Sequence, residues 1–199
     1  MSDRHGLLVA FEGLDQSGKQ TQAEALRDRL EASSRRVRLL SFPDYHSPIG
    51  AEIGRALRGE RDFGPDVLQL LYVANRHEWR PTIESELARG TVLVCDRYVA
   101  SSVAYGEAHG LDPAWLRSIQ TFLPTPHATF LLDMSPDASA RRKVADRDKF
   151  ERDLALLARV RESYLRQAAE AGWCRLDATR DRAAIAADVF TTIEPLLRA

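Results

Sequence analysis

The sequence predicts an α/β protein with three layers, αβα, in which a five-stranded parallel sheet lies between helices. Short apolar runs of about five residues alternate with longer stretches of helical periodicity, as is typical of a parallel sheet covered on both faces. The 199 residues are enough for one good core, and no linker interrupts them. We therefore expect one domain, residues 1–199, with a short mobile lid at residues 141–152.

The expected strands are the apolar runs at residues 7–11, 37–42, 92–95, 128–133 and 173–177. A first helix should begin near Gly18, after the first strand. A long helical pattern covers residues 65–89, where Pro81 should kink or break the helix and Gly90 should end it. A last helix is expected from about residue 182 to 197.

Charge and hydropathy argue against nucleic-acid and membrane partners. The 28 Lys and Arg residues against 29 Asp and Glu leave a formal net charge of −1, which is not the broad positive field that duplex binding needs. The apolar runs are far shorter than the roughly 20 residues that span a bilayer. Glu12 interrupts the first of them, unlike the apolar core of a secretory signal. We expect a cytoplasmic protein whose partners are small molecules.

Residues 13–19 read GLDQSGK, a GxxxxGK pattern between an expected strand and an expected helix. Glycines let such a loop curl so that its N–H groups point inward, and the helix N-terminus adds positive partial charge. Lys19 would neutralise the β- and γ-phosphates of a nucleotide. The residues expected to bind the nucleotide are Gly13, Gln16, Ser17, Gly18, Lys19, Gln20 and Thr21.

The phosphate loop departs from its usual pattern at one position. Gln20 follows Lys19 in place of the Ser or Thr whose hydroxyl usually ligates Mg²⁺, and Thr21 comes one residue later. A bound Mg²⁺ would therefore depend more on phosphate oxygens, water and carboxylates.

The third apolar run ends abruptly in Asp96 and Arg97. Ligands of open parallel sheets bind beyond the carboxyl ends of the strands, so both side chains should lie beside the phosphate loop. Asp96 suits a metal ion or its water, and Arg97 suits a second phosphate. The alternative is a solvent-exposed pair at a strand end.

Residues 141–152 are dense in cations and lack a clear apolar stripe. A solvated helix surface would account for this composition. However, the phosphate loop contains no arginine, and an arginine supplied to the moving phosphoryl group can be worth about 10³ to 10⁵ in rate. A lid that carries Arg147, with Arg142 as a second candidate, could provide that charge.

Taken together, these segments resemble the thymidylate kinase family of P-loop nucleoside monophosphate kinases over nearly the whole chain. The motifs are FEGLD at residues 11–15, FPDY at 42–45, YVANR at 72–76, DRY at 96–98, SSVAY at 101–105 and RDKFE at 147–151. A phosphate loop alone is shared by many enzymes. The order of all six segments is far more specific.

The resemblance implies roles for side chains that bind the acceptor nucleotide. Tyr72 would stack on thymine and Arg76 would hydrogen-bond the base, in keeping with a flat π face and a bidentate donor. Tyr105 would lie under the deoxyribose and exclude a 2′-hydroxyl. Without the family match, core packing would explain both tyrosines. Other residues implied at the acceptor site are Asp15, Phe42, Pro43, Tyr45, Arg97 and Ser102.

The resemblance further implies that Arg97 would bridge the phosphates of the two nucleotides and that Asp15 would orient the acceptor sugar and phosphate. Candidate Mg²⁺ ligands are Asp15, Asp96 and Glu151. The predicted catalytic residues are Asp15, Lys19, Arg97, Arg142 and Arg147. Family members form homodimers, so a homodimer is expected here too.

Two departures from the family pattern affect the acceptor site. Asp44 and Tyr45 follow Pro43 where many relatives carry arginine, and Gly106 stands where many carry glutamine. The first leaves the acceptor phosphate with fewer cationic contacts. The missing arginine of the phosphate loop groups this chain with relatives that supply the catalytic arginine from the lid.

The predicted function is thymidylate kinase activity, the transfer of the γ-phosphoryl group of ATP to dTMP with Mg²⁺. One alternative is a P-loop kinase for another small acceptor, such as a deoxynucleoside or a different nucleoside monophosphate. A GTPase-like switch is a second, although the chain has no Asn-Lys-x-Asp guanine motif. A catalytically dead nucleotide-binding relative is a third, suggested by Gln20.

Overall fold

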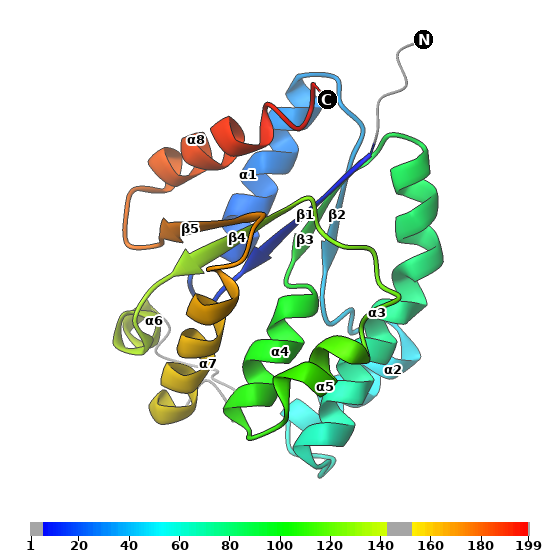
Figure 1. Ribbon diagram of the computed structural model, residues 1–199, viewed down its shortest axis with the longest axis vertical. Helices are drawn as coiled ribbons and strands as arrows, with labels where there is room; N and C mark the ends of the chain where they lie inside the picture. Colours follow the sequence, from blue (N-terminus) through cyan, green and yellow to red (C-terminus); the bar gives the residue numbers. More distant parts are fainter. Residues whose placement is uncertain (1–5, 143–152, 199) are drawn as a thin grey trace.

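The computed structural model of the protein describes residues 6–142 and 153–198 (Figure 1). Within them, one parallel sheet has five strands in the order β2-β3-β1-β4-β5. The strands are β1 (Leu7–Glu12), β2 (Val37–Ser41), β3 (Val92–Asp96), β4 (Ala128–Asp133) and β5 (Trp173–Asp177). The predicted parallel five-stranded sheet is thus confirmed.

Alternate residues of the central strand pack against opposite layers of helices. Leu7, Val9 and Phe11 of β1 belong to a cluster with apolar side chains of α1 (Lys19–Ala32) and α8 (Arg182–Ile193). Leu8 and Ala10 lie in a second cluster, on the face covered by α3 (Pro65–Ala88). Because both faces are covered, all six residues of β1 are buried.

The remaining helices surround the ends of the strands. α4 (Val99–Ala108) and α7 (Leu154–Gln167) pack against each other on the same face as α3. Three other helices, α2 (Pro48–Leu57), α5 (Pro113–Ser118) and α6 (Pro136–Arg142), lie beyond the carboxyl ends of the strands or beside them (Figure 1). Helices on both faces of the sheet confirm the predicted three-layer αβα architecture.

The structure corrects several expected boundaries. Pro81 was expected to kink or break the helix; the break is wrong, because α3 continues through it as one helix, whereas the kink stays a prediction. Although proline removes one backbone donor, Ile83, just beyond it, is fully buried in the core, and this packing outweighs the lost hydrogen bond. β2 ends at Ser41, β3 extends to Asp96, and α8 ends at Ile193.

The sheet topology places the site. The chain moves from β1 outward to β2 and returns to β3 beside β1, whereas β4 lies on the other side of β1. Directly after β3, the backbone N–H of Arg97 donates to the carbonyl of Phe11 near the carboxyl end of β1 at 2.9 Å. Such a reversal of strand order leaves a crevice at the strand ends, where open α/β sheets bind ligands.

No helix in the described ranges is long and apolar enough to cross a membrane.

Candidate active site

The loop between β1 and α1 has the backbone shape of a phosphate-binding loop. Gly13 and Gly18 have φ values of 138° and 93°, and Gln16 has a φ of 60°. A Cβ atom on Gly13 would lie 2.6 Å from the carbonyl oxygen of Leu132, so only glycine fits there. Three positive φ values in six residues curl the chain around a concave space at the N-terminus of α1, where N–H groups and the helix dipole attract anions.

The ammonium group of Lys19 lies at the base of this loop. The residue is 6% exposed, and Nζ donates to the carbonyl oxygen of Leu14 at 2.7 Å. Burial, with the nearby charge of Arg97, lowers the pKa of Lys19 to about 8, against the pull of Asp15 and Asp96. A buried cation that rests on a single carbonyl group suits an anionic ligand, whose charge would restore its pKa.

An ion pair between the phosphate loop and the end of β3 forms the centre of the site. Nη2 of Arg97 lies 2.6 Å from Oδ1 of Asp15, and the Tyr105 hydroxyl donates to Oδ2 at 3.2 Å. Burial would raise the pKa of Asp15, but Arg97 and Lys19 outweigh it and hold that pKa well below its usual value. Asp15 is therefore a carboxylate throughout the neutral range.

Arg97 is held in place from several directions. Its backbone is in the left-handed region, with a φ of 64°, a conformation that costs a non-glycine residue free energy and is often found at functional sites. Nη1 donates to the hydroxyl oxygens of Ser101 and Tyr164, each at 3.2 Å. These contacts fix the direction of the guanidinium group.

Glu12 connects the groups around Arg97 by hydrogen bonds. Its fully buried carboxylate accepts hydrogen bonds from the Tyr98 backbone N–H at 2.8 Å, the Ser101 hydroxyl at 2.6 Å and the Tyr164 hydroxyl at 3.1 Å. Three donors satisfy a charge that would otherwise be costly to bury. Because Ser101 and Tyr164 also contact Arg97, Glu12 positions Arg97 through them.

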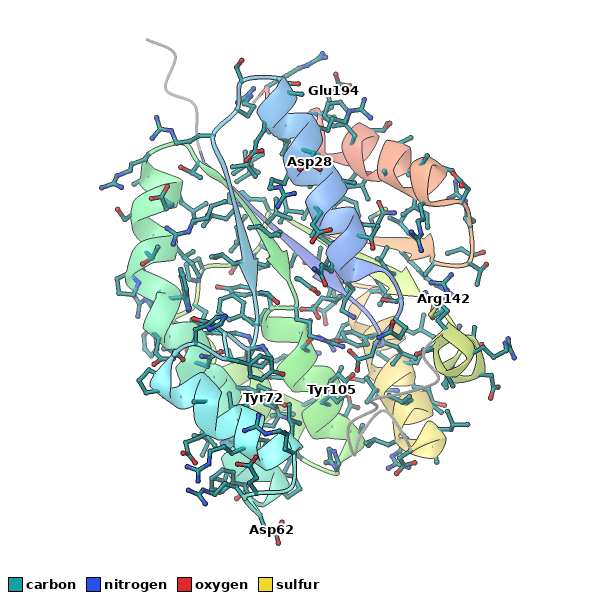
Figure 2. All side chains as sticks on the ribbon, turned by 180° about the vertical axis from the view of Figure 1, so that it is seen from behind. Asp28, Asp62, Tyr72, Tyr105, Arg142 and Glu194 are labelled. Carbon is teal, nitrogen blue, oxygen red and sulfur yellow. The ribbon has the colours of Figure 1, made fainter. Side chains whose placement is uncertain are left out.

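A first cavity of about 250 Å³ opens on one side of the Asp15–Arg97 pair. Its walls are mostly apolar or aromatic and come from the loops around α2, from α3 and from α4. They include Phe42, Pro43, Tyr45, Leu57, Phe63, Leu68, Tyr72 and Tyr105. Figure 2 shows Tyr72 and Tyr105 near each other beyond the strand ends, and both line this cavity.

A buried cation faces the same cavity. Arg76 of α3 is 2% exposed, and its Nη1 donates to the Ser102 hydroxyl at 2.8 Å and the Tyr72 carbonyl at 3.3 Å. Its Nε has no hydrogen-bond partner among the described residues, where no acidic side chain pairs with it. Burial lowers the pKa of Arg76. A guanidinium group with spare donors at a cavity wall is suited to a ligand rich in acceptors.

A second, larger cavity of about 790 Å³ lies on the other side of the ion pair. It extends over residues 15–22 of the phosphate loop and α1 toward Arg142, Ala178 and residues 180–182 at the start of α8. Both cavities are lined by Asp15, Phe42, Pro43, Tyr45 and Arg97. The arrangement can hold two ligands that meet at Asp15 and Arg97.

Comparison with known proteins identifies the family. The family model described as thymidylate kinase matches residues 11–189. The chain belongs to the thymidylate kinase family. It is 35% identical to the thymidylate kinase of Caenorhabditis elegans over 98% of this chain and 93% of that one. With a probable thymidylate kinase of Pyrobaculum aerophilum the identity is 37%, over 96% and 97% of the two chains.

A solved structure supports the same assignment. This thymidylate kinase family member superposes on the thymidylate kinase of Candida albicans with a TM-score of 0.82 and 26% sequence identity. The match covers 96% of this chain and 92% of the other. The Candida enzyme is described as having broad substrate specificity and a novel structural element.

Most of the nucleotide-binding residues predicted from the sequence line the larger cavity; only Gly13 does not, and it shapes the loop instead. Gln20 points its amide to Glu24 at 2.9 Å. The Gln20 side chain is thus engaged on the surface of α1, and Thr21 is exposed as well.

The region that was expected to be a lid is only partly described. Its first two residues, 141 and 142, form the end of α6, whereas Arg147 and Glu151 lie outside the described residues. Arg142 donates to the Gln16 carbonyl at 3.1 Å and to the Ala178 carbonyl at 2.8 Å. Figure 2 shows it beside α6, away from Tyr72 and Tyr105. Arg142 thus ends α6 and contacts the phosphate loop, and its assignment to a lid stays a prediction.

Asp44, which follows Pro43, has a structural role. The Asp44 carboxylate accepts hydrogen bonds from the indole N–H of Trp79 and from the backbone N–H of His46, each at 3.0 Å. Its backbone N–H donates to the Asn75 side chain at 2.8 Å. These contacts fasten the loop after β2 to α3. Tyr45, which is 50% exposed, lies at the mouth that the two cavities share.

Sequence reasoning missed several polar residues of the site. Glu12, Ser101 and Tyr164 had no assigned role, although a charged residue at the end of an apolar strand was a signal for Glu12. Tyr164 comes from α7, far along the chain, and nothing in its local sequence points to the site. Gln69 was also missed.

Proposed function

We propose that this protein transfers the γ-phosphoryl group of ATP to the 5′-phosphate of dTMP, which yields dTDP and ADP. The observation that carries the proposal is the meeting of two cavities at the Asp15–Arg97 pair. One has the polar backbone of a phosphate loop, and the other has aromatic walls and a buried arginine. Membership of the thymidylate kinase family supports the same reaction.

ATP would occupy the larger cavity. Its phosphates would lie against the backbone N–H groups of residues 15–19, with Lys19 beside the β- and γ-phosphates. Arg142 contacts Gln16 and Ala178 on the wall of this cavity, which favours a role on the nucleoside side of ATP.

dTMP would occupy the smaller cavity with its phosphate toward Arg97. Tyr72 and Phe42 offer flat faces for the base, and Arg76 offers unpaired donors for its oxygen atoms. The Ser102 hydroxyl accepts a hydrogen bond from Nη1 of Arg76 at 2.8 Å and would thereby orient the guanidinium group toward the base. Tyr105 lies against Asp15, where the sugar would be placed.

Catalysis would rest on position and charge. The acceptor is already an ionised phosphate, so the transfer needs no strong general base. The Arg97 guanidinium group would neutralise charge on both phosphates, while Asp15, held ionised by that same group, would keep it in line. Arg147, outside the described residues, is proposed as the further cation that stabilises the transition state.

The residues present fit a magnesium ion bound together with phosphates. Oδ1 of Asp96 is buried and without a hydrogen-bond partner in the described part of the chain, and Asp96 lines the larger cavity. The described residues contain no cluster of three or more metal-ligating side chains. Asp96 would therefore hold Mg²⁺ directly or through water, with phosphate oxygens as the other ligands. When bound, the ion would supply neutralising charge to the phosphates.

The proposal is tested by measuring ADP release from purified protein with ATP and Mg²⁺. dTMP, dUMP, dCMP, AMP, UMP and thymidine are offered in parallel, and a reaction without acceptor gives the background. Strong turnover with dTMP and little with the others is the expected result. Turnover confined to another acceptor would overturn the assignments of Tyr72, Arg76 and Tyr105, and nucleotide binding without ADP release would indicate a catalytically dead relative.

We also propose that the protein forms a homodimer, as the family resemblance implies. Val67 and Leu70 are exposed apolar side chains three residues apart on α3, and Phe122 is exposed just after α5. Light scattering of the purified protein would distinguish one chain from two.

A further inference from the structure

Gln69 lies on the same face of α3 as the two residues assigned to the base. Gln69, Tyr72 and Arg76 are spaced i, i+3 and i+7, which places them in one row along a helix. All three line the smaller cavity. Gln69 is only 2% exposed, although glutamine is usually a surface residue.

The amide of Gln69 is not fully used by the protein. Oε1 is buried and has no hydrogen-bond partner in residues 6–142 and 153–198. A buried polar atom without a partner is rare in folded proteins and often marks a place where a ligand or water binds. The last torsion of the side chain is broad and roughly two-fold, so the amide can turn its oxygen toward the cavity.

The packing around Gln69 depends on Gly106 of α4. A Cβ atom at Gly106 would lie 3.3 Å from Cγ of Gln69 and 2.6 Å from Cδ1 of Leu116. A side chain at position 106 would therefore displace Leu116 and press on Gln69. Because position 106 has no side chain, α4 packs closely against Leu116 of α5 and Gln69 of α3.

The chemistry of the base defines what Gln69 can do. A pyrimidine with a 4-oxo group presents an acceptor at O4 and a donor at N3–H, side by side. Arg76 has only donors, so it can satisfy O4 and cannot satisfy N3–H. An acceptor must therefore come from another group on the same wall.

We propose that Gln69 is a specificity-determining residue whose side-chain oxygen accepts the N3–H of a 4-oxopyrimidine while Arg76 donates to O4. This inference rests on the proposed function, because it assumes a pyrimidine nucleotide in the smaller cavity. It assigns the reading of the base edge to two residues of one helix, one that only donates and one that accepts. Cytosine presents a donor at position 4, which Arg76 cannot accept, so it mismatches Arg76; at N3, where cytosine is an acceptor, the Gln69 amide can turn and donate.

The test compares two substitutions by steady-state kinetics with dTMP at pH 8. Gln69→Met keeps the length of the side chain and removes the acceptor, whereas Gln69→His supplies a neutral acceptor nitrogen without a charge beside Arg76. We expect Gln69→Met to raise KM for dTMP about tenfold with kcat nearly unchanged, as for lost uniform binding. Gln69→His should stay within about threefold of the wild-type KM.

Gln167→Met is the matched control. Gln167 is also a buried glutamine, but it lies on α7, donates to the Ala100 carbonyl at 3.3 Å and does not line the smaller cavity. Its KM for dTMP should equal that of the wild type. An unchanged KM in Gln69→Met, or equal rises in both Gln69 variants, would overturn the inference. If the wild type does not phosphorylate dTMP, the proposed function itself fails.

Discussion

The two cavities that meet at Asp15 and Arg97 are built in different ways. Much of the larger cavity, the donor side in the proposed reaction, comes from one continuous segment, residues 15–22, in which backbone N–H groups and one lysine would face phosphate. The smaller cavity, which is the acceptor side in the proposed reaction, is assembled from side chains of the loop after β2, the start and middle of α3, and α4. A local motif can therefore specify the first cavity, and only the packing of several helices can specify the second.

We expect this difference to separate the residues that control turnover from those that control which nucleotide binds. On the donor side, charge close to the phosphates decides how fast the phosphoryl group moves, so substitutions there should change turnover or ATP affinity. On the acceptor side, the shape and hydrogen-bonding pattern of the wall decide which nucleotide binds. Arg97 contacts both regions, and it is the residue at which the two effects should merge.

The largest effect is expected from Lys19→Ala. Loss of the cation beside the β- and γ-phosphates should lower kcat/KM for ATP by about 10³-fold, because charge near the transferred group stabilises the transition state. KM for dTMP should stay within about threefold. Steady-state kinetics in both substrates measures this, and Lys19→Arg, which retains charge, is the control. A comparable rise in KM for dTMP would show that the two cavities are not separable.

Arg147→Ala should lower turnover by at least about 10²-fold, as expected for an arginine that acts in the transition state. dTMP affinity should change only a few-fold. Single-turnover measurements would isolate the chemical step, and Arg142→Ala provides the comparison, since Arg142 is bound to Gln16 and Ala178 at the donor wall. Unchanged turnover in Arg147→Ala would move this role to Arg142 or to another residue.

Tyr105→Ala should relax discrimination against the ribose analogue of dTMP by about tenfold, because in the proposed site it removes the ring that would exclude a 2′-hydroxyl. Tyr105→Phe keeps the ring and loses the hydroxyl's hydrogen bonds, at 3.2 Å to Asp15 and at 3.4 Å from Arg97. It should therefore still reject the ribonucleotide. The ratio of kcat/KM for the two nucleotides measures the effect, and an alanine variant as selective as the wild type would defeat the steric explanation.

The smallest effect is a pH dependence of ATP binding. In the proposed site the ammonium form of Lys19 would bind phosphate, and because burial lowers its pKa to about 8, it loses the proton as pH rises through that value. ATP affinity should fall about fourfold between pH 7 and 8.5, since binding must then take up a proton. Calorimetry across this range tests the sign. Lys19→Arg should bind ATP with a flat profile, and a flat profile in the wild type would contradict the lowered pKa.

The donor and acceptor sides also differ in how far they could be predicted. The glycines, Lys19 and the Asp96–Arg97 pair could be recognised because each lies at a strand end, and parallel strands bring their carboxyl ends to one edge. The acceptor tyrosines were assigned only by family resemblance, because an aromatic residue on a buried helix face is usually core. Gln69 carried no local signal at all.

The course of α3 through Pro81 and the contacts of Arg142 could not be predicted, and the reason is the same for both. A proline inside a helical pattern predicts a break, yet α3 passes through Pro81, because packing of Ile83 in the core outweighs one lost hydrogen bond. Arg142 was grouped with a run of cations, but it closes α6 and bonds to two carbonyl groups from other segments. Local composition could reveal neither the packing of Ile83 in the core nor the carbonyl groups that Arg142 contacts.

From the sequence alone one can derive the alternating α/β order, the phosphate loop and the polar strand end, because backbone periodicity and glycine geometry act over a few residues. The tertiary structure decided which side chains share a wall. It brought Glu12, Ser101 and Tyr164 around Arg97 from three elements, and it placed Gln69 beside Gly106. Such contacts join residues far apart in the chain, and their free energy depends on burial and geometry that only the folded protein defines.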